Sequence, residues 1–172
     1  MCDLFQFGSL FYAWGKSSLG DFIAVQSDRG LVAFEFAGPE GNVLDKLQAR
    51  LPDAALTEHP AAMAGTIAAL ARLVDHPDRD PGLALDIRGS DYEKKVWELL
   101  RQIPPGTTTS YGAVAAQMGT RDARDVTAAI ANNILAILIP CHRVVKKDGS
   151  LSGYRWGSTR KRALLERERK EN

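Results

Sequence analysis

The sequence contains little cysteine and no long hydrophobic run. Its 172 residues include two cysteines, Cys2 and Cys141, and two cysteines, one of them near the N-terminus, do not make a disulfide framework. No apolar segment reaches the roughly 18 residues of a membrane span, and the first residues lack a basic segment followed by a long apolar one. We therefore expect a cytoplasmic protein with no membrane partner and a free thiol at Cys141.

Histidine is also scarce, because the sequence has three, at positions 59, 76 and 142. His59 and His76 lie beside prolines in polar segments. Together with Cys2 they could be imagined as metal ligands, but none of these residues has the spacing of a zinc site. We predict no metal site and no cofactor.

Acidic and basic residues are distributed unevenly along the chain, although the net charge is only +1. Residues 1–90 contain 7 basic and 12 acidic residues, whereas residues 91–172 contain 15 basic and 9 acidic residues. The basic half is the half that contains Cys141. A positive surface favours binding to a polyanion such as nucleic acid, although solvated helical faces can produce a difference of this size.

Residues 1–88 are predicted to form a small α+β domain. The segments FYAWGK, DFIAVQS and GLVAFEF are rich in strand-forming residues and are separated by the turn signals SSLG and SDRG, which predicts three antiparallel strands. Helical spacing predicts helices over 42–51 and 61–74, and GLALDI is a possible further strand. This half contains no cluster of residues that suggests chemistry.

Residues 89–172 are predicted to be mainly helical. A cap at Ser90 or Asp91 begins one helix, which ends at PPG; a second, short helix begins at Ser110 and ends near Gly119, and a third covers TRDARDVTAAIANN. Two short helices joined by a glycine turn are typical of a helix-turn-helix, although many helical hairpins bind no DNA. The third helix carries small side chains, which would allow close approach of DNA or, alternatively, tight packing against another helix: Ala123, Thr127, Ala128 and Ala131.

Cys141 lies in the segment IPCHRVV, between a proline and a histidine. A thiolate is stabilised by nearby positive charge or by a histidine, and His142 could take the thiol proton through a water molecule. Such a base usually needs a carboxylate to orient it, and Glu166 and Glu168 in the last helix are both candidates. A buried, inert cysteine is the alternative, but the Pro-Cys-His-Arg context favours a nucleophile.

These segments resemble a known family. IPCHRVV, with SGYRWG downstream and VWELLRQIPPGTTTSYGAVAAQMG upstream, is similar to the O6-alkylguanine-DNA alkyltransferases, also called methylated-DNA-protein-cysteine methyltransferases, and especially to the C-terminal domain of the bacterial adaptive-response protein. The likeness runs from about residue 85 to residue 168 and is looser before it. It implies a ribonuclease H-like domain over 1–88 and a helical domain with a helix-turn-helix over 89–172. No cysteine cluster precedes the strands, so we expect no gene activation by this chain.

The resemblance implies direct-reversal DNA repair. One molecule would transfer the alkyl group, mainly methyl, from O6-alkylguanine or O4-alkylthymine to Cys141, irreversibly and once, after the base has flipped out of the helix. The partner would be double-stranded DNA, bound through the minor groove with little sequence specificity, and we expect a monomer. Two alternatives are a non-catalytic binder of alkylated DNA and an unrelated Cys-His-Glu hydrolase, for which no glycine-rich oxyanion hole lies beside Cys141.

The resemblance also implies roles for individual residues. Cys141 is the alkyl acceptor, His142 deprotonates it through water, and Glu168 orients the histidine. Tyr111 helps to rotate the nucleotide and hydrogen-bonds the flipped base, and Asn133 joins the helix-turn-helix to the active-site loop. The lesion pocket is expected to comprise Tyr111, Ala136, Pro140, Val144, Tyr154, Arg155, Trp156 and Lys161. Within it, Trp156 is predicted to narrow the pocket and to favour methyl over benzyl transfer.

The resemblance also implies an arginine that contacts DNA. Arg124 matches the arginine that fills the vacated place in the base stack, with Arg121 as the alternative because the turn after Gly119 is one residue shorter than is usual in the family. Asp122 and Asp125 flank Arg124, and carboxylates close to phosphates should weaken binding. The residues expected to face DNA are Arg124, Arg121, Ala123, Thr127, Ala128 and Ala131.

Overall fold

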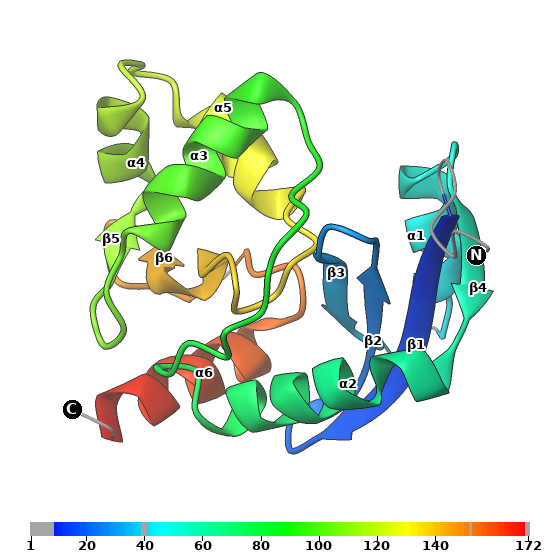
Figure 1. Ribbon diagram of the computed structural model, residues 1–172. Helices are drawn as coiled ribbons and strands as arrows, with labels where there is room; N and C mark the ends of the chain where they lie inside the picture. The colour runs from blue at the N-terminus through cyan, green and yellow to red at the C-terminus, as the bar shows by residue number, and fades with distance from the viewer. Residues whose placement is uncertain (1–8, 39–40, 152, 171–172) are drawn as a thin grey trace. The chain divides into compact units, whose positions relative to one another are not determined.

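The computed structural model describes residues 9–38, 41–151 and 153–170 (Figure 1). Its internal contacts divide the chain into two units, residues 1–75 with 80–87 and residues 76–79 with 88–172. The sequence places everything up to residue 88 in the first domain, whereas the segment 76–79 belongs to the second unit. One reason is that the carbonyl oxygen of Pro77 accepts a hydrogen bond from the Arg143 guanidinium at 3.4 Å.

The first unit is built on a four-stranded mixed sheet. Its strands are β1 (Ser9–Ser17), β2 (Gly20–Gln26), β3 (Leu31–Phe36) and β4 (Ala55–Glu58), in the order β3-β2-β1-β4. The first three are antiparallel, as predicted, and β4 runs parallel to β1. The strand β4 was not predicted, because most of its side chains are exposed and show no alternation. The further strand predicted at GLALDI is wrong, since only an isolated bridge between Leu31 and Leu85 forms there.

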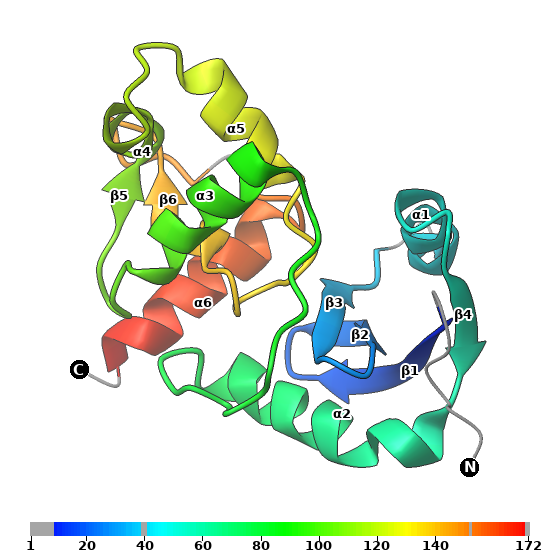
Figure 2. The same ribbon diagram turned by 45° about the horizontal axis from the view of Figure 1, so that its top comes forward.

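Two helices complete this unit, α1 (Val43–Arg50) and α2 (Pro60–Asp75). Helix α2 packs along β1, as Figure 2 shows. It can do so because β1 has a glycine at position 15, where a side chain would collide with Phe22 of β2 and Ile67 of α2. The rings of Phe22 and Phe34 stack with centroids 5.0 Å apart in the core beneath.

The second unit is mainly helical, and the predicted α+β class of the chain is confirmed. Its helices are α3 (Asp91–Arg101), α4 (Tyr111–Gln117), α5 (Ala123–Ala131), the short 3-10 turn η1 (Cys141–Arg143) and α6 (Ser158–Lys170). Ser90 and Glu93 form a reciprocal capping box at the start of α3, and the indole of Trp97 donates a hydrogen bond to the carbonyl of Ala129 on α5 at 2.9 Å. In the stretches that the structure describes, no helix combines the length and apolar content that a bilayer span requires.

Helices α4 and α5 form the predicted helical pair. Ser110 caps α4 by accepting a hydrogen bond from the backbone of Ala113 at 3.0 Å. Gly119 ends this helix with φ of 78°, in the left-handed region that glycine adopts without strain. The two helices pack against each other, which is the arrangement expected of a helix-turn-helix.

A two-stranded ladder joins the helical pair to the segment after Cys141. Strand β5 (Thr109–Ser110) pairs in parallel with β6 (Val144–Val145), with Thr109 opposite Val144. Tyr111 follows β5 directly, and Cys141 lies three positions before β6. The pairing therefore holds the start of α4 close to η1.

Candidate active site

The loop that leads to Cys141 is organised around a buried asparagine. The carboxamide oxygen of Asn133 accepts a hydrogen bond from the backbone of Leu135 at 2.8 Å, and its nitrogen donates to the carbonyl of Ile139 at 3.0 Å. The same nitrogen lies 3.3 Å from the sulfur of Cys141. Ile137 has φ of 67°, a left-handed conformation that a β-branched residue adopts only where its surroundings impose it. Asn133 thus ties the end of α5 to the sulfur.

Cys141 is the first residue of η1, and its side chain is 3% exposed. Burial raises the pKa of this thiol to about 11, although the hydrogen bond from Asn133 and the charges of Lys161 and Arg155 act in the opposite direction. The thiol is therefore protonated at neutral pH. It can act as a nucleophile only if a base removes its proton.

His142 is fully buried beside it and has one of its two ring nitrogens occupied. The Nε2 atom lies 2.6 Å from the carboxylate oxygen Oε1 of Glu168. Burial lowers the pKa of His142, despite the opposing effect of Glu168. Because an ionised carboxylate can only accept a hydrogen bond, Nε2 carries the hydrogen and Nδ1 carries a lone pair. Among the described residues Nδ1 has no hydrogen-bond partner, so a neutral base is available there.

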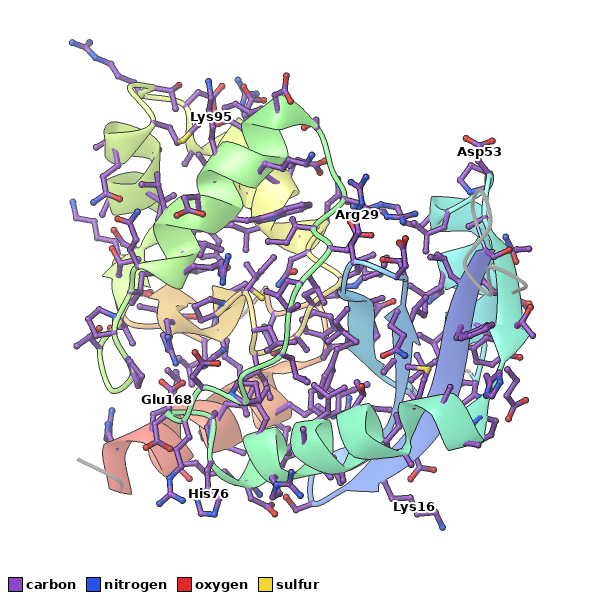
Figure 3. All side chains as sticks on the ribbon, in the orientation of Figure 1. Lys16, Arg29, Asp53, His76, Lys95 and Glu168 are labelled. Atoms are coloured by element: carbon purple, nitrogen blue, oxygen red, sulfur yellow. The ribbon has the colours of Figure 1, made fainter. Side chains whose placement is uncertain are left out.

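Glu168 lies on α6 (Figure 3) and is fully buried, whereas Glu166 is exposed. The structure therefore places Glu168, of the two candidates, on the imidazole. Burial opposes ionisation of Glu168, but the hydrogen bonds from His142 and Arg143 outweigh it and lower its pKa to about 2. The backbone of Gly106 donates a further hydrogen bond to the carboxylate at 3.3 Å.

Arg143 is a member of this network that the sequence analysis missed. Its guanidinium makes a buried ion pair with Glu168, at 2.7 Å from Nη2 and at 3.0 and 3.1 Å from Nε, and donates to the carbonyl of Ile103 at 2.7 Å. The position was visible in the sequence as the arginine directly after His142. A buried arginine requires an anion, which Glu168 supplies, but the burial of Arg143 is known only from the structure.

Three further polar side chains interact electrostatically with Cys141. Tyr111 is half-buried, and burial followed by the charge of Cys141 raises its pKa; the same two causes place the pKa of Tyr154 well above its usual value. The ammonium of Lys161 lies 5.9 Å from the centre of the Tyr111 ring, and burial lowers its pKa. Neither the Tyr154 hydroxyl nor the Lys161 ammonium has a hydrogen-bond partner within the described ranges. These two groups are therefore available to hydrogen-bond a polar ligand.

The remaining residues predicted for the pocket lie in two groups. Ala136, Pro140 and Val144 are buried on the chain around η1. Trp156 is also buried and meets the ring of Tyr154 edge to face with centroids 5.3 Å apart. Arg155 is exposed, and its guanidinium carbon lies 5.9 Å from the centre of the Trp156 ring.

The residues predicted to face DNA are not part of this network; Arg121 lies in the turn before α5 and the others lie on α5. Val126, Ala129 and Ile130 form the buried face of the helix. Ala123 is half-buried, and the other predicted contacts are exposed: Arg121, Arg124, Thr127, Ala128 and Ala131. Tight packing against another helix, the alternative considered for the small residues, is therefore wrong for the last three.

The imagined metal site is not formed in the part of the chain that the structure describes. No group of three histidine, cysteine, aspartate or glutamate side chains there is arranged to hold an ion. His59 accepts a hydrogen bond from the backbone of Ala62 at the start of α2 instead, and its ring lies against Phe11 with centroids 4.7 Å apart. Cys2 lies outside the described residues.

Comparison with known proteins agrees with this geometry. The family model for the 6-O-methylguanine DNA methyltransferase DNA-binding domain matches residues 91–170. The bifunctional transcriptional activator/DNA repair enzyme Ada of Escherichia coli is 39% identical over 158 residues, which cover 91% of this chain and 45% of that relative. This chain therefore spans about half the length of Ada.

Other relatives are matched over most of their length. The methylated-DNA-protein-cysteine methyltransferase of Mycolicibacterium paratuberculosis is 41% identical over 117 residues, which cover 67% of this chain and 71% of the relative. The crystal structure of Mycobacterium tuberculosis OGT in complex with DNA superposes with a TM-score of 0.76 at 32% identity and covers 93% of both chains. These likenesses show that the chain belongs to the methylated-DNA-protein-cysteine methyltransferase family.

Proposed function

We propose that this protein repairs DNA by transferring the alkyl group of O6-alkylguanine, mainly methyl, to Cys141 in a single irreversible turnover. O4-alkylthymine, which presents an alkyl group on a similar exocyclic oxygen, is a second expected substrate. The observation that carries the proposal is the buried hydrogen bond between Glu168 and His142, directly next in the chain to the buried thiol of Cys141. The name of the Mycolicibacterium paratuberculosis relative and the DNA complex of the Mycobacterium tuberculosis structure support it.

The transfer starts with removal of the thiol proton. Nδ1 of His142 takes this proton through a bridging water while Nε2 keeps its hydrogen bond to Glu168. The sulfur of Cys141 then attacks the alkyl carbon, so that a carbon–sulfur bond forms as the bond to O6 breaks and its electron pair moves into the guanine. The product is a thioether, which thiol reductants do not reverse, so each molecule acts once.

The guanine leaves as an anion and needs a proton. Tyr111 interacts electrostatically with Cys141, and because its pKa lies above its usual value its phenol is protonated at neutral pH and presents a hydrogen to the base. The open hydroxyl of Tyr154 and ammonium of Lys161 are donors for other acceptors of the base. The proton balance is complete when His142 releases its proton to solvent and Tyr111 takes up a proton from solvent.

The base has to leave the DNA helix for this reaction. A sulfur that is 3% exposed cannot reach an alkyl group on a stacked base, so the nucleotide flips into the site. We infer that α5 lies in the minor groove, because its exposed face includes the small residues Thr127, Ala128 and Ala131, which read little sequence. We infer further that Arg124 fills the vacated place in the stack. The unmodified thiol must stay reduced, which suits the bacterial cytosol.

Intact-protein mass spectrometry tests the proposal. The protein is incubated with a duplex that carries one O6-methylguanine, with Cys141→Ser and an undamaged duplex as controls. One added methyl group per molecule that is absent in both controls supports transfer to Cys141. No added mass together with retained binding in a gel shift would overturn transfer and leave a non-catalytic binder of alkylated DNA.

A further inference from the structure

The two aspartates that flank Arg124 stand in different relations to it. The carboxylate of Asp122 holds the guanidinium from two sides: Nε lies 3.0 Å from Oδ1 and 3.1 Å from Oδ2, and Nη2 lies 2.8 Å from Oδ2. Asp122 is also the N-cap of α5, because Oδ1 accepts a hydrogen bond from the backbone of Arg124 at 2.9 Å. The side chain of Arg124 is nevertheless 90% exposed.

Asp125 acts on Arg124 only through its charge. It lies in the first turn of α5 and raises the pKa of Arg124 by its Coulomb field, whereas the hydrogen bonds that Arg124 donates to Asp122 are the first cause of that rise. In the described part of the chain, every side-chain hydrogen bond of Arg124 goes to Asp122. The sequence alone treats the two aspartates as equivalent, and the structure separates them.

We propose that Asp122 occupies Arg124 in an ion pair that DNA has to break, so that this one carboxylate sets the strength and salt dependence of DNA binding. The inference rests on the proposed function, in which Arg124 meets DNA. The ion pair of Arg124 and Asp122 has no net charge and so adds no positive charge to the DNA surface. The guanidinium can contact a phosphate or a base stack only after it leaves the carboxylate. Asp122 is thus a positioning residue for binding, remote from the sulfur chemistry.

Asp122→Asn separates the ion pair from the cap. Asparagine is as good an N-cap as aspartate, so α5 keeps its start while Arg124 loses its partner. Asp125→Asn removes the same charge from the same helix turn and serves as the matched control. We expect Asp122→Asn to bind duplex DNA about threefold to fivefold more tightly than Asp125→Asn at low salt, the fold-change that corresponds to a well-formed exposed ion pair. In a plot of the logarithm of the binding constant against the logarithm of the salt concentration, the slope for Asp122→Asn should be steeper than that for Asp125→Asn by about 0.9. This is the value for one added cation at the DNA.

A double-mutant cycle with Arg124→Ala identifies the route of the effect. If Asp122 acts through Arg124, the gain from Asp122→Asn falls to that of Asp125→Asn once the arginine is absent. Fluorescence anisotropy with an undamaged labelled duplex measures these affinities, and thermal unfolding checks that the caps are intact. Equal gains for both aspartate variants, or a gain from Asp122→Asn that persists with Arg124→Ala, would overturn the inference.

Single-turnover transfer from the O6-methylguanine duplex keeps the inference apart from the proposed function. Asp122→Asn should lower the DNA concentration that gives half the maximal rate. A changed maximal rate with an unchanged half-saturating concentration would contradict a role in binding. If the wild-type protein takes up no methyl at any DNA concentration, the proposed function fails, while the anisotropy comparison still decides whether Asp122 controls Arg124.

Discussion

Glu168 should make the second unit sensitive to acid by an amount that the structure allows us to work out. Its pKa is about 2 in the folded protein, against 4.5 for an ordinary glutamate. One pKa unit corresponds to about 1.4 kcal/mol, so the shift contributes roughly 3 kcal/mol to the free energy of unfolding. Because the folded pKa is the lower one, this contribution is complete above the unfolded value of 4.5 and is lost as the pH falls towards 2.

Glu168→Gln removes this titration. The variant should also be less stable at neutral pH by about 3 to 5 kcal/mol, because it leaves the guanidinium of Arg143 buried without an anion. Its free energy of unfolding should then change less with pH than that of the wild type between 4.5 and 2, and the two curves should converge in acid. Glu166→Gln, on the exposed face of the same helix, is the control and should follow the wild-type curve throughout.

Urea unfolding at a series of pH values measures these curves. His142 contributes in the same direction at higher pH, because its folded pKa is also lowered, and Glu168→Gln removes a group that raises this pKa. The comparison between the variants is therefore made below pH 4.5, where Glu168 itself titrates. Parallel curves for wild type and Glu168→Gln through the acid range would refute the reasoning. So would equal loss of stability in Glu166→Gln and Glu168→Gln at neutral pH.

Three further predictions concern the site. The single-turnover transfer rate should hold as the pH falls below 6.5, because the pKa of His142 is lowered and the imidazole stays neutral; a rate that halves near pH 6.5 in quench-flow measurements would contradict this. Asn133→Ala should cost about 1 to 3 kcal/mol in urea unfolding, because the buried backbone N–H of Leu135 loses its acceptor, and a neutral result would refute that accounting. Methyl should transfer faster than benzyl from matched duplexes because Trp156 is buried against Tyr154, and equal rates would contradict a narrow pocket.

The helices of the second unit were predictable because their signals are local. A cap such as Ser90 or Ser110 acts on a backbone group three residues away, and the glycine turn at Gly119 needs only its own conformation. The ladder between β5 and β6 was not predictable. Two residues are too few for a periodic pattern, and Thr109 pairs with Val144 only because the intervening helices bring them together.

The sequence of the last helix did not show which glutamate, Glu166 or Glu168, pairs with His142. Lys161, Leu164 and Glu168 are all buried and follow helical spacing, whereas Glu166 points away from that face. A hydrophobic pattern assigns lysine and glutamate to the solvent side, so the buried face of this helix reads as exposed. Only the partners of Glu168, His142 and Arg143, explain why a charged residue lies inside, and no local pattern contains them.

Burial, assisted by Arg143, determines the charge state in which the site rests. A carboxylate beside an imidazole normally favours the imidazolium, which cannot accept a proton, but the guanidinium neutralises Glu168 and lowers the pKa of His142 further. The resting pair is therefore a neutral thiol and a neutral imidazole, unlike the thiolate and imidazolium of a low-pKa cysteine. Since the thiolate is the reactive form, Cys141 stays inert towards other electrophiles until a substrate reaches it. If Cys141 acts once, as proposed, a protonated resting state prevents its loss to side reactions.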